Sequence, residues 1–157
     1  MISKLFKLLF YIIFFVAIIA VFARYLFSIS YLPVKIHSKY YKSSNLAIEG
    51  YDMVQYFKEN DFKKGNDMFY VNWNDYNWLF KSSTNSNLFK AHPLNYAPQF
   101  GGYCSYMITK NIAYPCDPKV FYIYKRKLYL FSSESKKDAF IADIDNQIEK
   151  ASLNWNK

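Results

Sequence analysis

The chain is poor in several residue types, and each shortage excludes a class of protein. Only two of its 157 residues are cysteine, which excludes a disulfide-dense scaffold and a four-thiolate zinc site. Only four are glycine, which excludes collagen-like repeats and long glycine-rich phosphate-binding loops. Charged residues make up 20% and hydrophobic residues 52%, a balance that a long disordered chain does not have.

The motifs of common enzyme classes are missing as well. The chain contains no GxSxG, P-loop, HExxH or GxGxxG pattern. Three aspartates lie in separate predicted turns and form no recognisable pair of catalytic carboxylates: Asp52, Asp75 and Asp117. No internal repeat is apparent, and the length is that of one domain of about 100–200 residues. These observations favour a binding or interaction domain over an enzyme.

A net charge of +8 raises the question of nucleic-acid binding. Lys4, Lys7 and Arg24 contribute to this charge, but they flank an apolar run at the N-terminus. Residues 28–157 carry 17 basic and 12 acidic residues, so an excess of +5 remains. Because these lysines are scattered and form no stripe, we expect no nucleic-acid partner.

An uncharged apolar run extends from Leu8 to Ala23, between Lys7 and Arg24. With its apolar ends it reaches about 20 residues, enough to cross a hydrocarbon core of ~30 Å. A soluble core helix would carry polar positions on one face, and this run has none. We favour an uncleaved membrane anchor over residues 8–27. The alternative is a signal peptide with a cleavage site at Val21-Phe22-Ala23.

The lysines before the run predict its orientation. Lys4 and Lys7 keep the N-terminus inside, so the rest of the chain lies outside the cytoplasm in both cases. We therefore expect an inner (cytoplasmic) membrane protein whose domain faces the periplasmic or extracytoplasmic side. After signal cleavage the domain would instead be secreted or periplasmic.

Three parts follow from this pattern: an anchor or signal segment over 1–27, a tether over 28–46 and a globular domain over 47–157. The tether contains Pro33 and several serines and lacks helical periodicity, and we assign its His37 no role. The first half of the domain is predicted to contain a short strand over 47–50, helical turns over 51–57 capped by Asp52, a turn over 63–66, strands over 69–73 and 76–80, and a helix from Ser82 or Ser83 to His92. The second half is predicted to contain a glycine bend over 100–104, a helix to Lys110, a loop over 115–118 and strands over 120–124 and 128–131. A final helix is expected from Ser132 or Ser133 through Phe140, Ile144 and Ile148. Hairpins separated by helices predict an α+β domain.

Two blocks of sequence carry a family resemblance: AIEGYDMVQYF over 47–57 and YAPQFGGYC over 96–104. Shorter matches are Trp78-Leu79-Phe80, Ser82-Ser83, Phe89 to Pro93, Asp117-Pro118, Lys127 to Leu130 and Ala151…Asn154-Trp155. On these residues, about positions 47–155 resemble the bacterial YHS domain-containing proteins. The match is to the long form, which keeps a cysteine after Gly-Gly-Tyr.

The resemblance implies some chemistry and excludes other chemistry. Short YHS modules attached to copper-transporting ATPases are thought to bind metal through cysteines one and five residues after the aromatic residue matching Phe80. Here those positions hold Lys81 and Asn85, so a metal site of that type cannot exist. Long-form relatives keep the cysteine matching Cys104, and some are described with selenocysteine in this family. This suggests redox or soft-metal chemistry at Cys104.

Cys104 is therefore the main candidate for chemistry. It precedes a predicted helix, and a helix N-terminus lowers the pKa of a thiol. Gly101 and Gly102 would let a ligand or a backbone segment approach closely just before it. The alternative is that Cys104 is a small buried apolar residue, as free cysteines commonly are.

Cys116 and His92 are the other candidate residues. In an oxidising compartment Cys116 could form a disulfide with Cys104, closing a loop worth ~3 kcal/mol in the loop-entropy model. We favour free thiols, because the resemblance singles out Cys104 and not the pair. His92 could join both cysteines in a soft site for copper or zinc. Alternatively, it interacts only with the end of its own helix.

The sequence thus predicts an exported, membrane-tethered YHS-type module that binds a soft metal ion or a small ligand. One alternative is a thiol-based redox protein that uses Cys104. Another is an interaction domain without chemistry. The many tyrosines and tryptophans could line a ligand pocket, although such residues more often form core.

Overall fold

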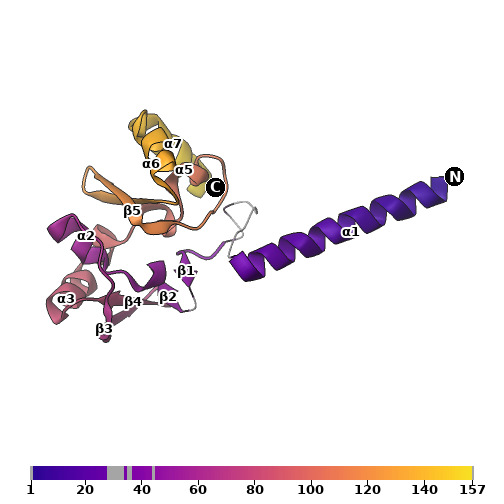
Figure 1. Ribbon diagram of the computed structural model, residues 1–157. Coiled ribbons are helices and arrows are strands. Elements are labelled where there is room, and N and C mark those ends of the chain that lie inside the picture. Colours follow the sequence, from indigo (N-terminus) through magenta and orange to yellow (C-terminus); the bar gives the residue numbers. More distant parts are fainter. Residues whose placement is uncertain (1, 28–33, 35–36, 44, 157) are drawn as a thin grey trace. The chain divides into compact units, whose positions relative to one another are not determined.

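The computed structural model describes residues 2–27, 34, 37–43 and 45–156. The chain divides into two units, residues 1–31 and 32–157. The first unit contains the helix α1, Ile2–Phe27, drawn in Figure 1 as one continuous helix. Its stretch Lys4–Phe22 has a mean hydropathy of 2.8, and none of its side chains is buried. This exposed apolar helix is long enough to cross a membrane and has the features of a signal sequence or membrane anchor.

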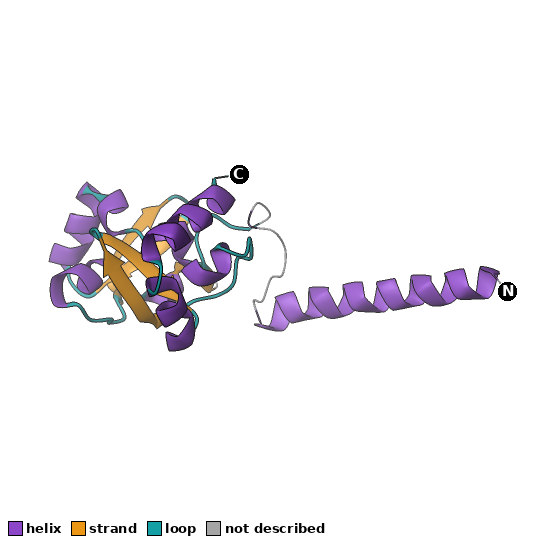
Figure 2. Cartoon of the chain, turned by 90° about the horizontal axis from the view of Figure 1, so that it is seen from above, coloured by secondary structure: helices purple, strands orange, loops and turns teal. Residues whose placement is uncertain are grey.

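The second unit is an α+β domain, as predicted, and Figure 2 shows its helices around the strands. Four strands form one sheet in the order β1-β2-β4-β3, and β5 and β6 form a separate hairpin. Only the β2–β4 pairing is parallel. The elements are β1 Lys42–Ser43, β2 Leu46–Ala47, a 3₁₀ turn Ile48–Gly50, α2 Met53–Glu59, β3 Asn66–Trp73, β4 Tyr76–Phe80, α3 Ser83–Ala91, α4 Pro93–Tyr96, a 3₁₀ turn Gln99–Gly102, α5 Ser105–Ile108, β5 Asp117–Tyr124, β6 Lys127–Phe131, α6 Glu134–Ile141 and α7 Ile144–Trp155.

The domain contains a structural repeat that was not predicted from the sequence. β3 and β5 have eight residues each, and β4 and β6 have five each. Each hairpin has a two-residue turn and one register irregularity in the same place, and each is followed by a helix with a serine N-cap. Corresponding elements begin 51 residues apart, at Asn66 and Asp117, Tyr76 and Lys127, and Ser83 and Glu134. The expectation that the chain has no repeat is therefore wrong for the fold.

The repeat includes the segment before each hairpin. Residues 48–50 have φ angles of 46°, 54° and 77°, and residues 100–102 have φ angles of 52°, 61° and 78°. An extended tyrosine follows each triplet, and then comes the N-cap position of α2 or α5, Asp52 or Cys104. Residues 48–52 and 100–104, which lie in the two sequence blocks that carry the family resemblance, are thus equivalent segments of the two halves.

Matching aromatic pairs form the core of each half. Phe80 packs on Phe89 with ring centroids 5.0 Å apart, and Phe131 packs on Phe140 at 5.3 Å. All four side chains are fully buried. The four phenylalanines thus occupy corresponding positions of the repeat, and in each half aromatic side chains build the hydrophobic core.

Several predicted boundaries are wrong. The predicted turn at 63–66 is extended, since Lys64 bridges to Tyr51 and the Gly65 N–H donates to the Gly50 carbonyl at 2.9 Å. The domain also begins before residue 47, because Tyr40 and Tyr41 of the predicted tether are buried and β1 and β2 pair. The rest of the tether prediction, at 28–33, 35–36 and 44, lies outside the described residues.

The remaining differences concern helix lengths and one loop. The helix after Cys104 ends at Ile108 and not at Lys110. The predicted final helix is two helices, α6 and α7, which lie against each other. The predicted loop at 115–118 gives way to β5 at Asp117.

Candidate functional site

The two resembling blocks lie against each other inside the domain. The Tyr41 N–H donates to the Gly101 carbonyl at 2.8 Å, and the Ile48 N–H donates to the Tyr41 carbonyl at 3.0 Å. A side chain at Gly102 would place its Cβ 2.2 Å from the Cδ1 of Ile48. Gly102 also has a positive φ of 78°, so both space and backbone conformation favour glycine here.

Cys104 lies in this packed region with no exposed surface. Its N–H donates to the Tyr114 carbonyl at 2.9 Å, and the Ser132 hydroxyl lies 3.4 Å from its Sγ. The helix that follows has only four residues, Ser105–Ile108, and the thiol caps none of its N–H groups. The short helix and the complete burial both differ from the exposed, electropositive setting of a reactive cysteine.

Asp52, the equivalent of Cys104, is also fully buried, but both of its carboxylate oxygens accept hydrogen bonds. One oxygen accepts from the N–H groups of Val54 and Gln55, as predicted for a helix cap. The other accepts from the Lys81 N–H at 2.8 Å and from the Asn85 amide at 2.7 Å. The backbone of Lys81 and the side chain of Asn85 thus hold this buried carboxylate.

Cys116 is buried too, and the described structure contains both cysteines as free thiols. Burial raises the pKa of Cys116 well above its usual value, and the negative charge of Glu49 and the neighbouring Cys104 raise it further. Cys116 is therefore a neutral thiol at physiological pH.

His92 does not share this environment. It is exposed at the junction of α3 and α4, where its N–H donates to the Leu88 carbonyl. Among the residues that the structure describes, no three His, Cys, Asp or Glu side chains gather as metal ligands. The predicted trio of His92, Cys104 and Cys116 is therefore not assembled.

An open groove of the domain lies elsewhere, beside α4. A groove of about 790 Å³ runs between the end of α2, α4 and the β5–β6 turn. It is lined by Phe57, Lys58, Leu94, Asn95, Tyr96, Ala97, Gln99, Ile123, Lys125, Arg126 and Lys127. A second hollow of about 350 Å³ shares Leu94, Ala97, Gln99 and Lys127 with it and extends to Lys39 and Trp155. We call these two adjoining hollows the α4 groove.

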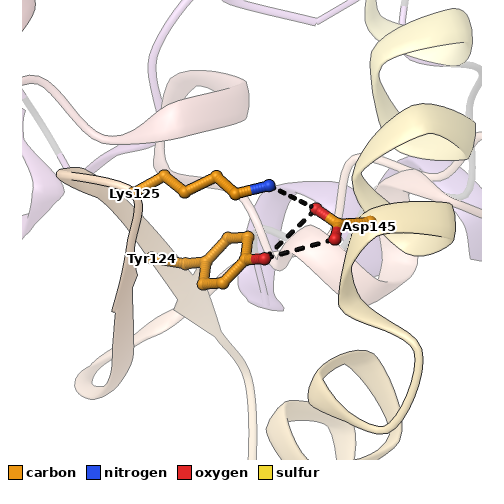
Figure 3. Close-up of polar contacts among 3 residues, drawn as sticks. All are labelled: Tyr124, Lys125 and Asp145. Atoms are coloured by element: carbon orange, nitrogen blue, oxygen red, sulfur yellow. Dashed lines mark hydrogen bonds and ion pairs between the residues drawn. The ribbon is translucent and has the colours of Figure 1, made fainter.

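The β5–β6 turn is held in place by contacts to α7, shown in Figure 3. Lys125 Nζ lies 2.9 Å from a carboxylate oxygen of Asp145, and the Tyr124 hydroxyl donates to the same carboxylate at 3.2 Å. The ammonium of Lys125 also lies over the Tyr124 ring, 4.8 Å from its centroid. The hydrogen bond from Lys125, together with its charge, lowers the pKa of Asp145, so this carboxylate stays ionised in the neutral range.

No family model, curated protein or solved structure matches this chain. The resemblance to YHS proteins therefore stays a prediction from the sequence blocks.

The α4 groove was not predicted from the sequence. Its residues come from segments interpreted only as helix ends and turns, and no motif joins them. One signal was present: Lys125 and Arg126 stand where a two-residue hairpin turn prefers asparagine and glycine.

Proposed function

We propose that this chain is a membrane-tethered, extracytoplasmic module of the YHS type that binds a small ligand in the α4 groove. The observation that carries the proposal is the groove itself. Its volume falls in the range of roughly 300–1,000 Å³ typical of small-molecule sites. It combines apolar side chains, such as Phe57 and Ile123, with charged and amide groups that could orient a ligand.

The location is part of the proposal. α1 would hold the module at the inner membrane, and the lysines at its start favour a domain outside the cytoplasm. Cleavage after residue 23 would release the same module without changing its groove. The soft-metal interpretation has weaker support, because the described residues offer no set of three ligands.

A substitution that fills the groove tests the binding proposal. The full chain in detergent would be screened by thermal shift against neutral, cationic and anionic metabolites, and hits would be measured by calorimetry. Asn95→Trp should remove binding, because Asn95 lines the groove. The control is Asn87→Trp on α3, which is exposed and does not line it. If every hit binds Asn95→Trp as tightly as the wild type, the proposal is wrong.

A thiol-based redox protein is the second candidate. It is supported by the presence of two buried free thiols, Cys104 and Cys116, in the domain. Free thiols would be counted in protein isolated under non-reducing, denaturing conditions. None, with monomeric mobility, would show a Cys104–Cys116 disulfide and overturn the prediction of free thiols. If two are free, a reaction of Cys104 with an alkylating agent faster than that of a model thiol at neutral pH would favour the redox protein.

A further inference from the structure

We propose that the ligand of the α4 groove is an organic phosphate, with at least two negative charges beside an apolar portion. This inference rests on the proposed function and names its ligand class. Among the residues that the structure describes, no aspartate or glutamate lines the groove, whereas five cationic side chains do: Lys39, Lys58, Lys125, Arg126 and Lys127. A cavity lined by one sign of charge attracts the opposite charge.

Most of these charges lack a counter-ion within the described part of the chain. Lys125 is the one lining residue with an ion pair there, to Asp145. Lys58 donates to the Asn85 amide oxygen at 3.3 Å, a neutral partner. One carboxylate would neutralise only a fraction of the remaining charge. A phosphate monoester carries about 1.5–2 negative charges at neutral pH, so it fits better.

The β5–β6 turn, which supplies Lys125 and Arg126, has a less favourable backbone conformation for its residues than the equivalent β3–β4 turn has. Their φ angles are 49° and 60°, in the left-handed region that disfavours long side chains. At the equivalent positions of the first hairpin, Asn74 and Asp75 adopt 51° and 66°. Asparagine and aspartate tolerate this conformation because their short side chains bond locally. Of the two equivalent turns, only the one that lines the groove therefore carries long cationic side chains at left-handed backbone positions.

The groove also has a place for the apolar portion of the ligand. Phe57, Tyr96 and Ile123 are half-buried on its wall, and Leu94 is 77% exposed at the junction of the two hollows. Arg126 can bind phosphate oxygens through two parallel N–H donors, which a lysine cannot do. Charge at the turn and apolar surface beside α4 together describe an amphipathic phosphate.

The repeat provides a matched pair of variants for the test. Arg126→Gly removes a charge from the groove, and Asp75→Gly makes the same backbone change in the equivalent turn outside it. The full chain in phosphatidylcholine nanodiscs would be titrated with ATP, glucose 6-phosphate, glycerol 3-phosphate and pyrophosphate. Adenosine and glucose would serve as phosphate-free controls. Because charged bidentate hydrogen bonds are lost, Arg126→Gly should weaken binding about tenfold or more. Asp75→Gly should leave it unchanged, and Arg126→Lys should fall between.

A second arm distinguishes a free phosphate from a lipid headgroup. Dihexanoyl phosphatidic acid, whose headgroup is a phosphate monoester, would be titrated as a monomer in place of the soluble phosphates. Arg126-dependent binding of this lipid alone would assign the phosphate to a headgroup and support the class. Absence of binding by all phosphate probes, or equal losses in Arg126→Gly and Asp75→Gly, would overturn the inference. A neutral or cationic ligand lost in Asn95→Trp would also overturn it while leaving the proposed function intact.

Discussion

Asp52 and Cys104 occupy one position of the repeat, yet they have different surroundings. The Asp52 carboxylate accepts four hydrogen bonds, which compensate for its removal from water. Cys104 needs no such compensation, because a buried cysteine packs as a small apolar residue. Burial disfavours the thiolate of Cys116 and raises its pKa, so Cys116 is a neutral thiol. At the residue scale, the two thiols therefore belong to the core.

Because the Cys116 thiol is held neutral in the folded protein, we expect the free energy of unfolding to decrease as the pH becomes alkaline. The unfolded chain loses the thiol proton near pH 8.5, while the folded protein keeps it, because its pKa is raised. The unfolded state then binds fewer protons, so the free energy of unfolding decreases as pH rises above about 8.5, by up to ~1.4 kcal/mol per unit. Urea unfolding of the reduced full chain between pH 7 and 9.5 measures this.

Cys116→Ala should flatten that profile, and Asn87→Ala, a surface control, should keep it. The range stops before pH 10 because burial also raises the pKa values of Tyr41 and Tyr56, which would add their own losses above that pH. An unchanged slope in Cys116→Ala would show that the thiol is not held neutral by the fold.

The two hairpins of the repeat share backbone geometry and differ in turn chemistry. Asn74-Asp75 and Lys125-Arg126 both lie in the left-handed region, and the second turn is connected to α7 through Asp145. Both members of that ion pair are exposed, so it orients the turn more than it stabilises the fold. Figure 1 shows the β5–β6 hairpin extending toward α2, where its turn lines the groove. At the element scale, the second turn therefore carries residues that its left-handed backbone does not favour.

Relief of strain at this turn should therefore stabilise the domain. A non-glycine residue in the left-handed region is less stable by roughly 1–2 kcal/mol, and glycine avoids most of this. We expect Arg126→Gly to raise the free energy of unfolding by about 1 kcal/mol. Asp75→Gly should raise it less, because aspartate already tolerates this conformation. Urea unfolding of both variants checks this, and a loss of stability in Arg126→Gly would contradict it.

The whole molecule combines an exposed apolar helix with a separate α+β domain. α1 contains no acidic residue and has lysines at its start, which is the charge bias of a helix whose N-terminus stays in the cytoplasm. The repeat also matters for the domain as a whole. Each half contributes one wall of the α4 groove, α2 from the first half and the β5–β6 turn from the second.

The topology can be tested with protease and intact spheroplasts. We expect external protease to degrade the domain, because residues 28–157 would lie outside the cytoplasmic membrane. Disruption of the membrane should add no further cleavage sites in the domain. A domain that stays intact until the membrane is broken would reverse the topology. A soluble product beginning at Arg24 would show that α1 is a cleaved signal.

The sequence by itself determined the features that depend on neighbouring residues. The apolar run, both hairpin turns, and the caps at Asp52, Ser82 and Ser133 follow from local patterns of hydrophobicity, turn residues and short polar side chains. These patterns were enough to predict the α+β class. They also singled out the two blocks that lie together in the core.

Tertiary structure alone decided the repeat, the burial of the thiols and the α4 groove. The repeat is seen in the backbone geometry, because the identical residues of the two halves are few and separated and other equivalent positions, such as Asp52 and Cys104, differ in type. The exposed His92 and the buried cysteines could be separated only by three-dimensional packing. The groove joins Lys58 to Arg126, residues far apart in the chain. Burial and charge compensation depend on such long-range contacts, which local sequence patterns do not contain.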